Sequence, residues 1–274
     1  MNAGSWQTIA IAGVGLIGGS FALALRKAGF KGRILGVSSP RTIQAALERG
    51  VIDEGLPLEK AVAQSEMVYL AQPIETIINT LTLVDTAVRP GTLITDAGST
   101  KDRIVAEARR HIRRGRFVGG HPMAGKEVRG VEAADANLFE GRPYVLTGSD
   151  RELEDWIARI GGRLVRLEPD EHDRLVALVS HLPQLLSTAL ASLLTGEGRA
   201  ASVCGPAAHD MTRLAQSPYD IWRDILATNP QQILLALDAL SAKLDQIKDK
   251  LRAGQSLEAD FLAAADFARH LRRS

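Results

Sequence analysis

The stretch Gly13-Val14-Gly15-Leu16-Ile17-Gly18 decides the fold of this chain. It follows a short apolar run, Thr8 to Ala12, and opens a segment of helical spacing that continues to about Ala28. Gly13 permits a tight turn after the strand, and Gly15 lets a pyrophosphate approach the backbone. Gly18 allows the helix to pack closely against the strand. The helix N-terminus then faces the phosphates. Close packing of small residues alone would also explain the pattern, but we expect a dinucleotide site formed by Gly13, Gly15, Leu16, Ile17 and Gly18.

Beyond the glycine motif, apolar runs alternate with helical segments as far as about residue 167. Strands are predicted at Arg33–Val37, Met67–Ala71, Leu93–Thr95, Phe117–Gly119, Tyr144–Thr147 and Arg163–Leu167, and helices at Thr42–Arg49 and Ile74–Val88. Strands separated by helices imply a parallel sheet with crossover helices. The first part of the chain is therefore predicted to be an α/β domain of the Rossmann type, over residues 1–168.

After Pro169 the pattern becomes helical. Helices are predicted at His172–Leu194, interrupted only by Pro183, and at Ile221–Leu226, Pro230–Leu251 and Leu257–Leu271. The penultimate helix carries one apolar stripe, formed by Ile233, Leu237, Leu240, Leu244, Ile247 and Leu251. We expect an all-α domain over residues 169–274 with more apolar helix surface than one chain buries. A homodimer through this half is the natural arrangement.

Composition limits the classes of protein that remain. The 274 residues are 45% hydrophobic and 24% charged with a net charge of +1, as in a soluble two-domain protein. The basic cluster from Arg109 to Arg116 fits the solvated end of a helix better than a nucleic-acid patch. Cys204 is the only cysteine, and His172 and His181 do not share a clean helix face, so neither a disulfide nor a metal site is expected. The sequence shows no signal peptide and no apolar run of the ~20 residues that a membrane span needs, so we expect a cytoplasmic protein.

The end of the second predicted strand bears on which dinucleotide binds. Enzymes that use NAD usually place an acidic residue there, to hold the ribose 2′-hydroxyl. This chain has Gly36-Val37-Ser38-Ser39-Pro40-Arg41-Thr42 and no acid. Two hydroxyls and a guanidinium suit a 2′-phosphate, which a carboxylate would repel. We therefore favour NADP, held by Ser38, Ser39 and Arg41, with NAD possible; the alternative is an ordinary Ser-Pro turn beside a solvated arginine.

Four further positions are candidates for chemistry. His121 lies between glycines in a loop after a predicted strand, where a titratable group could move a proton beside a nicotinamide; a histidine bonded to the backbone is the alternative. Ser99 either caps the helix that follows it or reaches the cofactor and substrate. Lys101, just beyond, is either solvated or in contact with an anionic group. Arg213 lies in a polar stretch before an apolar helix, where it could bind a carboxylate through two hydrogen bonds.

Together these motifs resemble the prephenate/arogenate dehydrogenase family of tyrosine biosynthesis over nearly the whole chain. The glycine motif with Gly19-Ser20 is shared with many dehydrogenases. The resemblance rests more specifically on Asp96-Ala97-Gly98-Ser99-Thr100-Lys101, Gly120-His121-Pro122-Met123-Ala124-Gly125 with Leu138-Phe139, His172-Asp173, Ser180-His181-Leu182-Pro183 and Asp210-Met211-Thr212-Arg213. It implies an NAD(P)-dependent oxidative decarboxylation of a cyclohexadienol, either arogenate or prephenate.

The resemblance also implies roles for individual residues. His121 would take the proton of the ring hydroxyl as hydride leaves the ring carbon, with Ser99 orienting it. Arg213 would hold a substrate carboxylate. The other implied site residues are His181 and Trp222 lining the pocket, Gln184 near the substrate side chain, and Gln72 and Pro73 beside the cofactor.

Two positions depart from the family pattern. His209 stands before Asp210 where the family often has arginine, which leaves the role of His209 open. Gln184 stands where many members have histidine, so this position leaves the choice between prephenate and arogenate open. The pair Ser38-Ser39 resembles the members that use NADP and prefer arogenate. We therefore favour arogenate with NADP.

Two other classes of protein remain open. A nucleotide-binding domain followed by a helical dimer domain also suits 3-hydroxyacid and 6-phosphogluconate-type dehydrogenases and imine reductases. Those usually carry a lysine on the first helix of the second domain, and His172–Leu194 contains none. A non-catalytic nucleotide-sensing protein is the other alternative. It would leave His121, Ser99 and Arg213 without coordinated roles.

Overall fold

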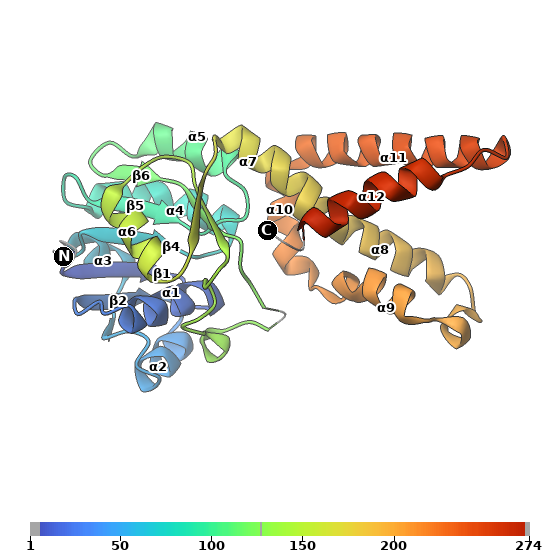
Figure 1. The fold of residues 1–274 in the computed structure, drawn as a ribbon. Coiled ribbons are helices and arrows are strands. Elements are labelled where there is room, and N and C mark those ends of the chain that lie inside the picture. The colour runs from blue at the N-terminus through green and yellow to red at the C-terminus, as the bar shows by residue number, and fades with distance from the viewer. Residues whose placement is uncertain (1–5, 127, 272–274) are drawn as a thin grey trace.

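The first half of the chain forms a six-stranded parallel sheet covered by helices (Figure 1). The structure is a computed structural model that describes residues 6–126 and 128–271. The strand order is β3-β2-β1-β4-β5-β6, so the order reverses direction between β1 and β4, where ligands bind in open α/β sheets. The strands are β1 (Thr8–Ala12), β2 (Arg33–Val37), β3 (Glu54–Gly55), β4 (Met67–Leu70), β5 (Leu93–Asp96) and β6 (Arg116–Val118).

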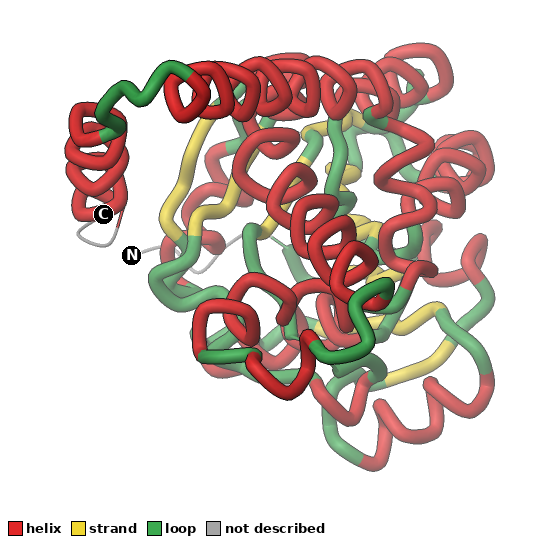
Figure 2. The backbone as a smooth tube through the Cα atoms, turned by 90° about the vertical axis from the view of Figure 1, so that its right-hand side faces the viewer, coloured by secondary structure: helices red, strands yellow, loops and turns green. Residues whose placement is uncertain are grey.

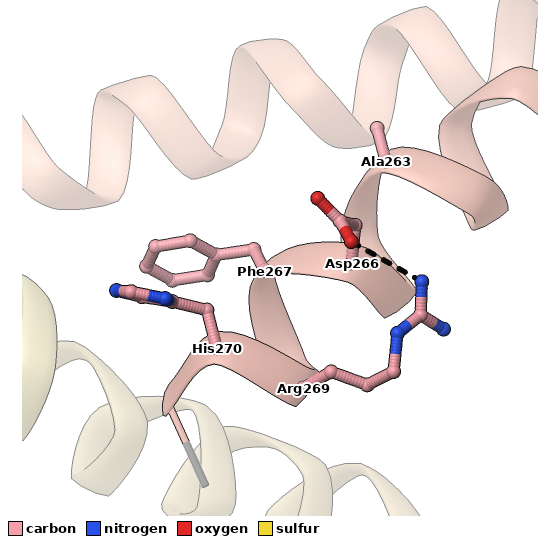
Figure 3. Close-up of a pocket in the computed structure, with 5 residues that line it drawn as sticks. All are labelled: Ala263, Asp266, Phe267, Arg269 and His270. Carbon is pink, nitrogen blue, oxygen red and sulfur yellow. Dashed lines mark hydrogen bonds and ion pairs between the residues drawn. The ribbon is translucent and has the colours of Figure 1, made fainter. Parts of the chain in front are cut away.

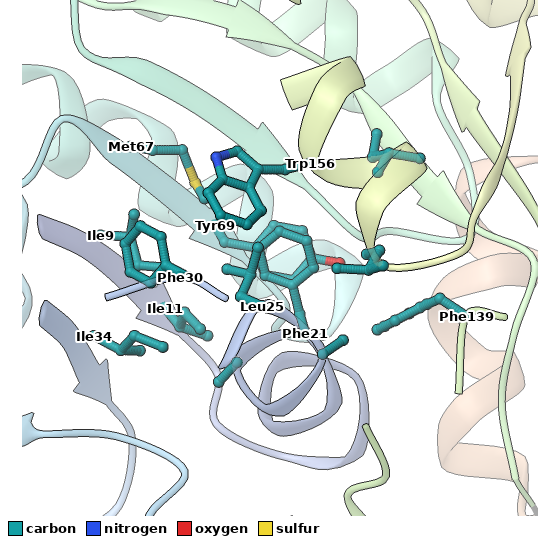
Figure 4. Packing of buried hydrophobic residues seen from close by; sticks show 14 of the residues in the cluster. Ile9, Ile11, Phe21, Leu25, Phe30, Ile34, Met67, Tyr69, Phe139 and Trp156 are labelled. Atoms are coloured by element: carbon teal, nitrogen blue, oxygen red, sulfur yellow. The ribbon is translucent and has the colours of Figure 1, made fainter. Parts of the chain in front are cut away.

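Helices bury both faces of this sheet, because side chains alternate along each strand. Ile9 and Ile11 of β1 belong to one apolar cluster, in which the rings of Phe21 and Tyr69 stack 4.1 Å apart (Figure 4). Ala10 and Ala12 belong to the cluster on the opposite face. The helices of this half are α1 (Leu16–Lys27), α2 (Pro40–Glu48), α3 (Leu58–Ala63), α4 (Ile74–Ala87), α5 (Asp102–His111) and α6 (Arg151–Arg159).

A second, three-stranded sheet holds the segment that contains His121. It consists of β7 (Gly120–Pro122), β8 (Pro143–Leu146) and β9 (Arg163–Arg166), with β7 antiparallel to β8 and β8 parallel to β9. The expectation that His121 lies in a loop is therefore wrong, since His121 pairs with Val145 across the ladder. A three-residue strand that begins with glycine and ends with proline has no alternation to reveal it. The elements β3 and α3 were also missed, because two and six residues are too few to show a clear period.

The second half is helical and extends away from the sheet (Figures 1 and 2). The long α11 projects outward, and α12 turns back from its far end; Figure 2 shows α12 standing apart from the other helices. None of the described residues of α12 is buried. The helices are α7 (Pro169–Val176), α8 (Leu182–Thr195), α9 (Pro206–Thr212), α10 (Tyr219–Thr228), α11 (Pro230–Arg252) and α12 (Glu258–Leu271).

A π-helical turn, Ala177–His181, joins α7 to α8 without ending the helix. Pro183 lacks the N–H that an α-helix would bond four residues back, and the wider turn ends two residues before it, at His181. Such turns are frequent at functional sites. The helical path therefore continues from Pro169 to Thr195. The expectation that Pro183 interrupts this helix is wrong.

This continuous segment departs from one expectation drawn from the sequence. Pro169–Thr195 has the length and the mean hydropathy, 1.4, of a membrane span, although no such run was expected. One helix of this kind is weak evidence, because the core helix of a soluble protein passes the same test. This one buries polar side chains against the rest of the protein, namely His172, Asp173, His181 and Gln184.

Candidate active site

A cleft of about 1180 Å³ lies between the two halves. The first half contributes the turn before α1 and the segments that follow β4 and β5, while the second half contributes α8, α10 and the turn before α10. The structure thus brings together in one cavity many of the site residues predicted from the sequence. These are Gly15, Leu16, Ile17, Gln72, Pro73, Ser99, Gln184, Arg213 and Trp222.

The glycine motif has the geometry that a dinucleotide requires. Gly13 has a φ of 95°, and a Cβ there would lie 2.5 Å from the carbonyl oxygen of Ala71. A Cβ on Gly18 would lie 2.1 Å from the carbonyl oxygen of Gly13. A Cβ on Gly15 would meet nothing within 4 Å, and Gly15 caps α1 without a side-chain hydrogen bond. The start of α1 lines the cleft and carries no side-chain cap, which fits a phosphate group.

Gln72 offers a second sign of a ligand in this part of the cleft. Its Oε1 atom is buried and has no hydrogen-bond partner among the described residues. Leaving such an acceptor unpaired costs about 1–3 kcal/mol. Gln72 also lines the cleft, so a donor on a bound cofactor could supply the missing bond.

The three residues expected to choose between NADP and NAD lie at the carboxyl end of β2. Ser38 and Arg41 are exposed. Ser39 is the N-cap of α2, where its Oγ accepts a hydrogen bond of 3.3 Å from the N–H of Thr42. Ser39 thus has the turn-forming role that the simpler interpretation predicts. All three lie outside the residues that line the cleft.

His121 lies in a buried chain of hydrogen bonds that crosses between the halves. Its Nδ1 is 2.8 Å from Nε2 of His172, and the two rings meet edge to face with centroids 5.0 Å apart. Nδ1 of His172 is 2.7 Å from Oδ1 of Asp173. Burial, followed by the neighbouring His172 and Lys101, lowers the pKa of His121 well below its ordinary value. Burial also lowers the pKa of His172. Both imidazoles are therefore neutral at pH 7.

Asp173 also caps α5 of the first half. Its carboxylate accepts hydrogen bonds from the backbone N–H groups of Lys101, at 2.7 Å, and Asp102, at 3.0 Å. A carboxylate at a helix N-terminus is stabilised by the helix dipole. Ser99 was considered as the cap of this helix, but Asp173 fills that role and Ser99 lines the cleft.

Lys101 is not solvated but contacts an anionic group, the second of the two expectations, and that group belongs to the protein itself. Its ammonium group is fully buried and pairs with the equally buried carboxylate of Asp96. Burial lowers the pKa of Lys101, and the charge of Asp96 acts in the opposite direction. Asp96 further accepts hydrogen bonds from the N–H groups of Gly98, at 2.8 Å, and Gly120, at 3.0 Å. One carboxylate therefore ties the loop of Ser99 to the strand of His121.

The helical half supplies the other wall of the site. His181, expected to line the pocket, is 1% exposed and lies outside the residues that line the cleft. It ends the π-helical turn, and its ring meets that of Trp222 edge to face at 6.0 Å. Burial lowers the pKa of His181 to about 4. Gln184 is buried, and its Nε2 donates to the carbonyl oxygen of Leu214 at 2.8 Å. Gln184 therefore anchors the segment that begins with Arg213.

Sequence reasoning missed the network around His121. His172-Asp173 stood out as a motif, but its contact with His121 spans 51 residues and no local pattern could indicate it. Asp96 and Lys101 likewise gave no sign of their mutual burial. In the described part of the chain, no cluster of three or more His, Cys, Asp or Glu side chains could hold a metal ion.

The glycine turn, the sheet's switch point and the cleft between the halves define a two-domain dinucleotide-binding protein of the Rossmann class. The chain belongs to the prephenate dehydrogenase family. The family model for the prephenate dehydrogenase nucleotide-binding domain matches residues 21–166, and that for the prephenate dehydrogenase dimerization domain matches residues 168–270. The reaction class is accordingly the dehydrogenation of a cyclohexadienyl substrate.

Individual relatives agree with this assignment. The chain is 35% identical to a prephenate dehydrogenase of Lactococcus lactis over 261 residues, which cover 92% of this chain and 74% of the relative. The structure of Aquifex aeolicus prephenate dehydrogenase with hydroxyphenyl propionate and NAD+ matches with a TM-score of 0.89 and 31% identity, over 96% and 97% of the two chains. Synechocystis arogenate dehydrogenase matches with a TM-score of 0.83 and 28% identity, over 97% and 100%.

Proposed function

We propose that this protein oxidatively decarboxylates a cyclohexadienol in tyrosine biosynthesis, with arogenate and NADP favoured over prephenate and NAD. The observation that carries the proposal is the neutral imidazole of His121, held by His172 where the two halves meet. His121 is not itself among the residues that line the cleft, but Ala124 and Gly125, which follow it in the chain, are. Arogenate would give tyrosine, and prephenate would give 4-hydroxyphenylpyruvate.

The residues of the site divide the chemistry among them. A bound nicotinamide supplies a hydride acceptor for the hydroxyl-bearing ring carbon. As that hydride leaves, the ring hydroxyl becomes acidic, and the neutral ring of His121 takes its proton. The ring carboxylate departs as carbon dioxide, and the ring becomes aromatic. Arg213 holds a carboxylate of the substrate. Ser99, at the cleft wall, orients His121, and Trp222 lines the pocket with the ring of His181 packed against it.

The preference for NADP rests on the end of β2. No carboxylate stands there to hold a 2′-hydroxyl or to repel a 2′-phosphate, and the exposed Arg41 can pair with a phosphate. The preference for arogenate rests on the serine pair Ser38-Ser39 and on the resemblance it carries. Membership of the family does not decide either preference. The Aquifex aeolicus relative, for example, was solved with NAD+.

We also propose a homodimer formed through the helical half, with the two domains meeting at residues 168–169. β9 ends at Arg166 and α7 begins at Pro169, which supports that boundary. The exposed apolar side chains of α12 support the dimer, and Figure 3 shows Phe267 and His270 projecting together from this helix. These apolar residues are Phe261, Leu262, Phe267 and Leu271. The second family match is itself described as a dimerization domain.

One assay tests the reaction and both preferences. Formation of reduced cofactor is followed with arogenate and prephenate, each combined with NADP and with NAD. We expect the highest kcat/KM for arogenate with NADP. A higher value with NAD would overturn the cofactor preference, a higher value with prephenate would overturn the substrate preference, and no turnover in any combination would overturn the function.

A further inference from the structure

The hydrogen bonds from Asp173 through His172 to His121 have only one possible direction. A carboxylate accepts hydrogen bonds but donates none, so the proton between Asp173 Oδ1 and His172 Nδ1 belongs to His172. A neutral imidazole carries one N–H, which leaves Nε2 of His172 as an acceptor. The proton between the two rings must then lie on Nδ1 of His121. The remaining nitrogen, Nε2 of His121, is left with a lone pair that can accept a proton.

We infer that His172 and Asp173 are positioning residues that hold His121 in the Nδ1–H tautomer, so that its Nε2 is the base of the reaction. The inference rests on the proposed function for the role of that base. It assigns a task to two residues that are not among those lining the cleft and that stood out in the sequence only as a motif. Both halves of the protein are then needed to form the base, since His121 lies on β7 and its two partners lie on α7.

The carboxylate at the start of this chain is held firmly in place. Asp173 is 2% exposed, and its two oxygens accept from the backbone N–H groups of Lys101 and Asp102. The side-chain amide of Asn229 donates to its backbone carbonyl oxygen at 2.8 Å. Asp173 cannot rotate away from His172 without breaking the cap of α5. The docking of the two halves therefore fixes the direction of the hydrogen bonds from His121 through His172 to Asp173.

The arrangement has a consequence for proton transfer. When Nε2 of His121 takes a proton, the ring becomes a cation whose Nδ1–H already donates to neutral His172. Neutral His172 stabilises the new charge through the lone pair of its Nε2 without rearrangement, whereas a positive charge on His172 would repel it and lower the pKa of His121. The other charged or titratable groups facing this pair are Lys101 and His181, which lower the pKa of His121, and the carboxylates Asp96 and Asp173, which raise the pKa of His172.

The tautomer can be read directly by NMR. Long-range ¹⁵N–¹H spectra of the uniformly labelled full-length protein, without substrate, show which ring nitrogen of each histidine carries the proton. The signal of His121 is assigned with the variant His121→Asn. We expect Nδ1–H in the wild type; an Nε2–H tautomer at His121 would overturn the inference. This measurement does not depend on turnover, so a failure of the proposed function and a failure of this inference are distinguishable.

Kinetics with variants of His172 supply the second test. His172→Leu removes the acceptor, so kcat should fall at least about tenfold while the Kd of the cofactor is unchanged. Because the protonated form of His121 loses its partner, the acid limb of the kcat–pH profile should move to lower pH. His172→Gln retains an acceptor oxygen and should restore part of kcat. His111→Leu, on the exposed end of α5, is the matched control and should change neither quantity.

The opposite results are equally specific. An acid limb that stays in place in His172→Leu would show that His172 does not act on the titration of His121. A limb that moves to higher pH would show that His172 acts as a cation rather than as a neutral acceptor. Either result would overturn the inference.

Discussion

Asp224 on α10 accepts a hydrogen bond from the backbone N–H of Glu75 in the first turn of α4, with 3.3 Å between Glu75 N and Asp224 Oδ2. Asp173 makes the corresponding contact with the first turn of α5. Two carboxylates of the helical half thus cap two neighbouring helices of the sheet half. Because helix N-termini attract negative charge, these contacts fix the relative position of the halves and with it the shape of the cleft.

Replacing Asp224 should loosen this docking. Asp224→Ala leaves the N–H of Glu75 without its carboxylate partner, and a lost cap of this kind costs about 0.5–2 kcal/mol. We expect a lower Tm by calorimetry. Asp155→Ala, an exposed change on α6, is the control and should stay within about 0.5 kcal/mol of the wild type. Equal Tm values for the two variants would contradict a docking role for Asp224.

Removing the proposed base should abolish turnover and spare the cofactor. His121→Asn retains a polar side chain but provides no basic nitrogen, so kcat should fall by about 10²–10⁴-fold. Cofactor binding, measured by calorimetric titration, should be unchanged, because the glycine motif and Gln72 are untouched. His111→Asn serves as the control. Turnover that survived in His121→Asn would exclude His121 as the base.

His181 should make the fold less stable in acid. Burial, partly offset by Asp173, lowers its pKa from the ordinary value of 6.5 to about 4 in the folded protein. Between about pH 4 and pH 6.5, His181 is therefore protonated in the unfolded chain and neutral in the folded chain. The free energy of unfolding decreases as the pH falls from about 6.5 toward 4. The shift corresponds to roughly 3 kcal/mol.

Urea unfolding as a function of pH isolates this contribution. We expect the wild type to lose more stability than His181→Gln between pH 6.5 and pH 4, since glutamine does not titrate. Parallel curves for the two proteins would show that the histidine does not change its pKa on folding.

Arg41 should matter for one cofactor only. If its guanidinium pairs with a 2′-phosphate, Arg41→Ala should raise the KM for NADP by roughly tenfold and leave the KM for NAD unchanged. Arg49→Ala, at the other end of α2, removes a similar exposed charge and is the matched control. An equal rise in KM for both cofactors would show that Arg41 does not distinguish them.

The exposed face of α12 should hold the dimer together. Phe267→Asp places a charge on a side chain that is 62% exposed in the single chain, so it should shift the protein toward monomer. Sedimentation velocity measures the change. Leu83→Asp, at an exposed apolar position of α4 in the first half, should leave the assembly intact. A dimer that persists in Phe267→Asp would place the interface elsewhere.

Much of the fold could be predicted because its signals are local. The central strands and the long helices lie within a few residues of their predicted positions, since apolar periodicity records which face each element buries. The short strand β7 could not be predicted, because three residues with glycine and proline at the ends carry no period. The π-helical turn escaped prediction as well, since Pro183 reads as a helix break unless the neighbouring backbone adjusts.

In the candidate site, too, individual residues could be predicted from local motifs, whereas their contacts with distant parts of the chain could not. Ser99, Gln184, Arg213 and Trp222 were predicted from motifs, and the structure gathers them at one cleft, where their individual roles remain predictions. The position of Gln184 was foreseen, but its hydrogen bond to Leu214 was not. That bond gives Gln184 a place in supporting the Arg213 segment.

The sequence by itself determined the glycine turn and the helix that follows it. Backbone freedom at Gly13 and close packing at Gly18 are properties of a few consecutive residues. Only the tertiary structure decided the state of His121. Its tautomer depends on Asp173, which is 52 positions away along the chain and reaches it through His172. A proton's location on a ring is set by hydrogen-bond partners, and those partners meet only when the helical half docks on the sheet.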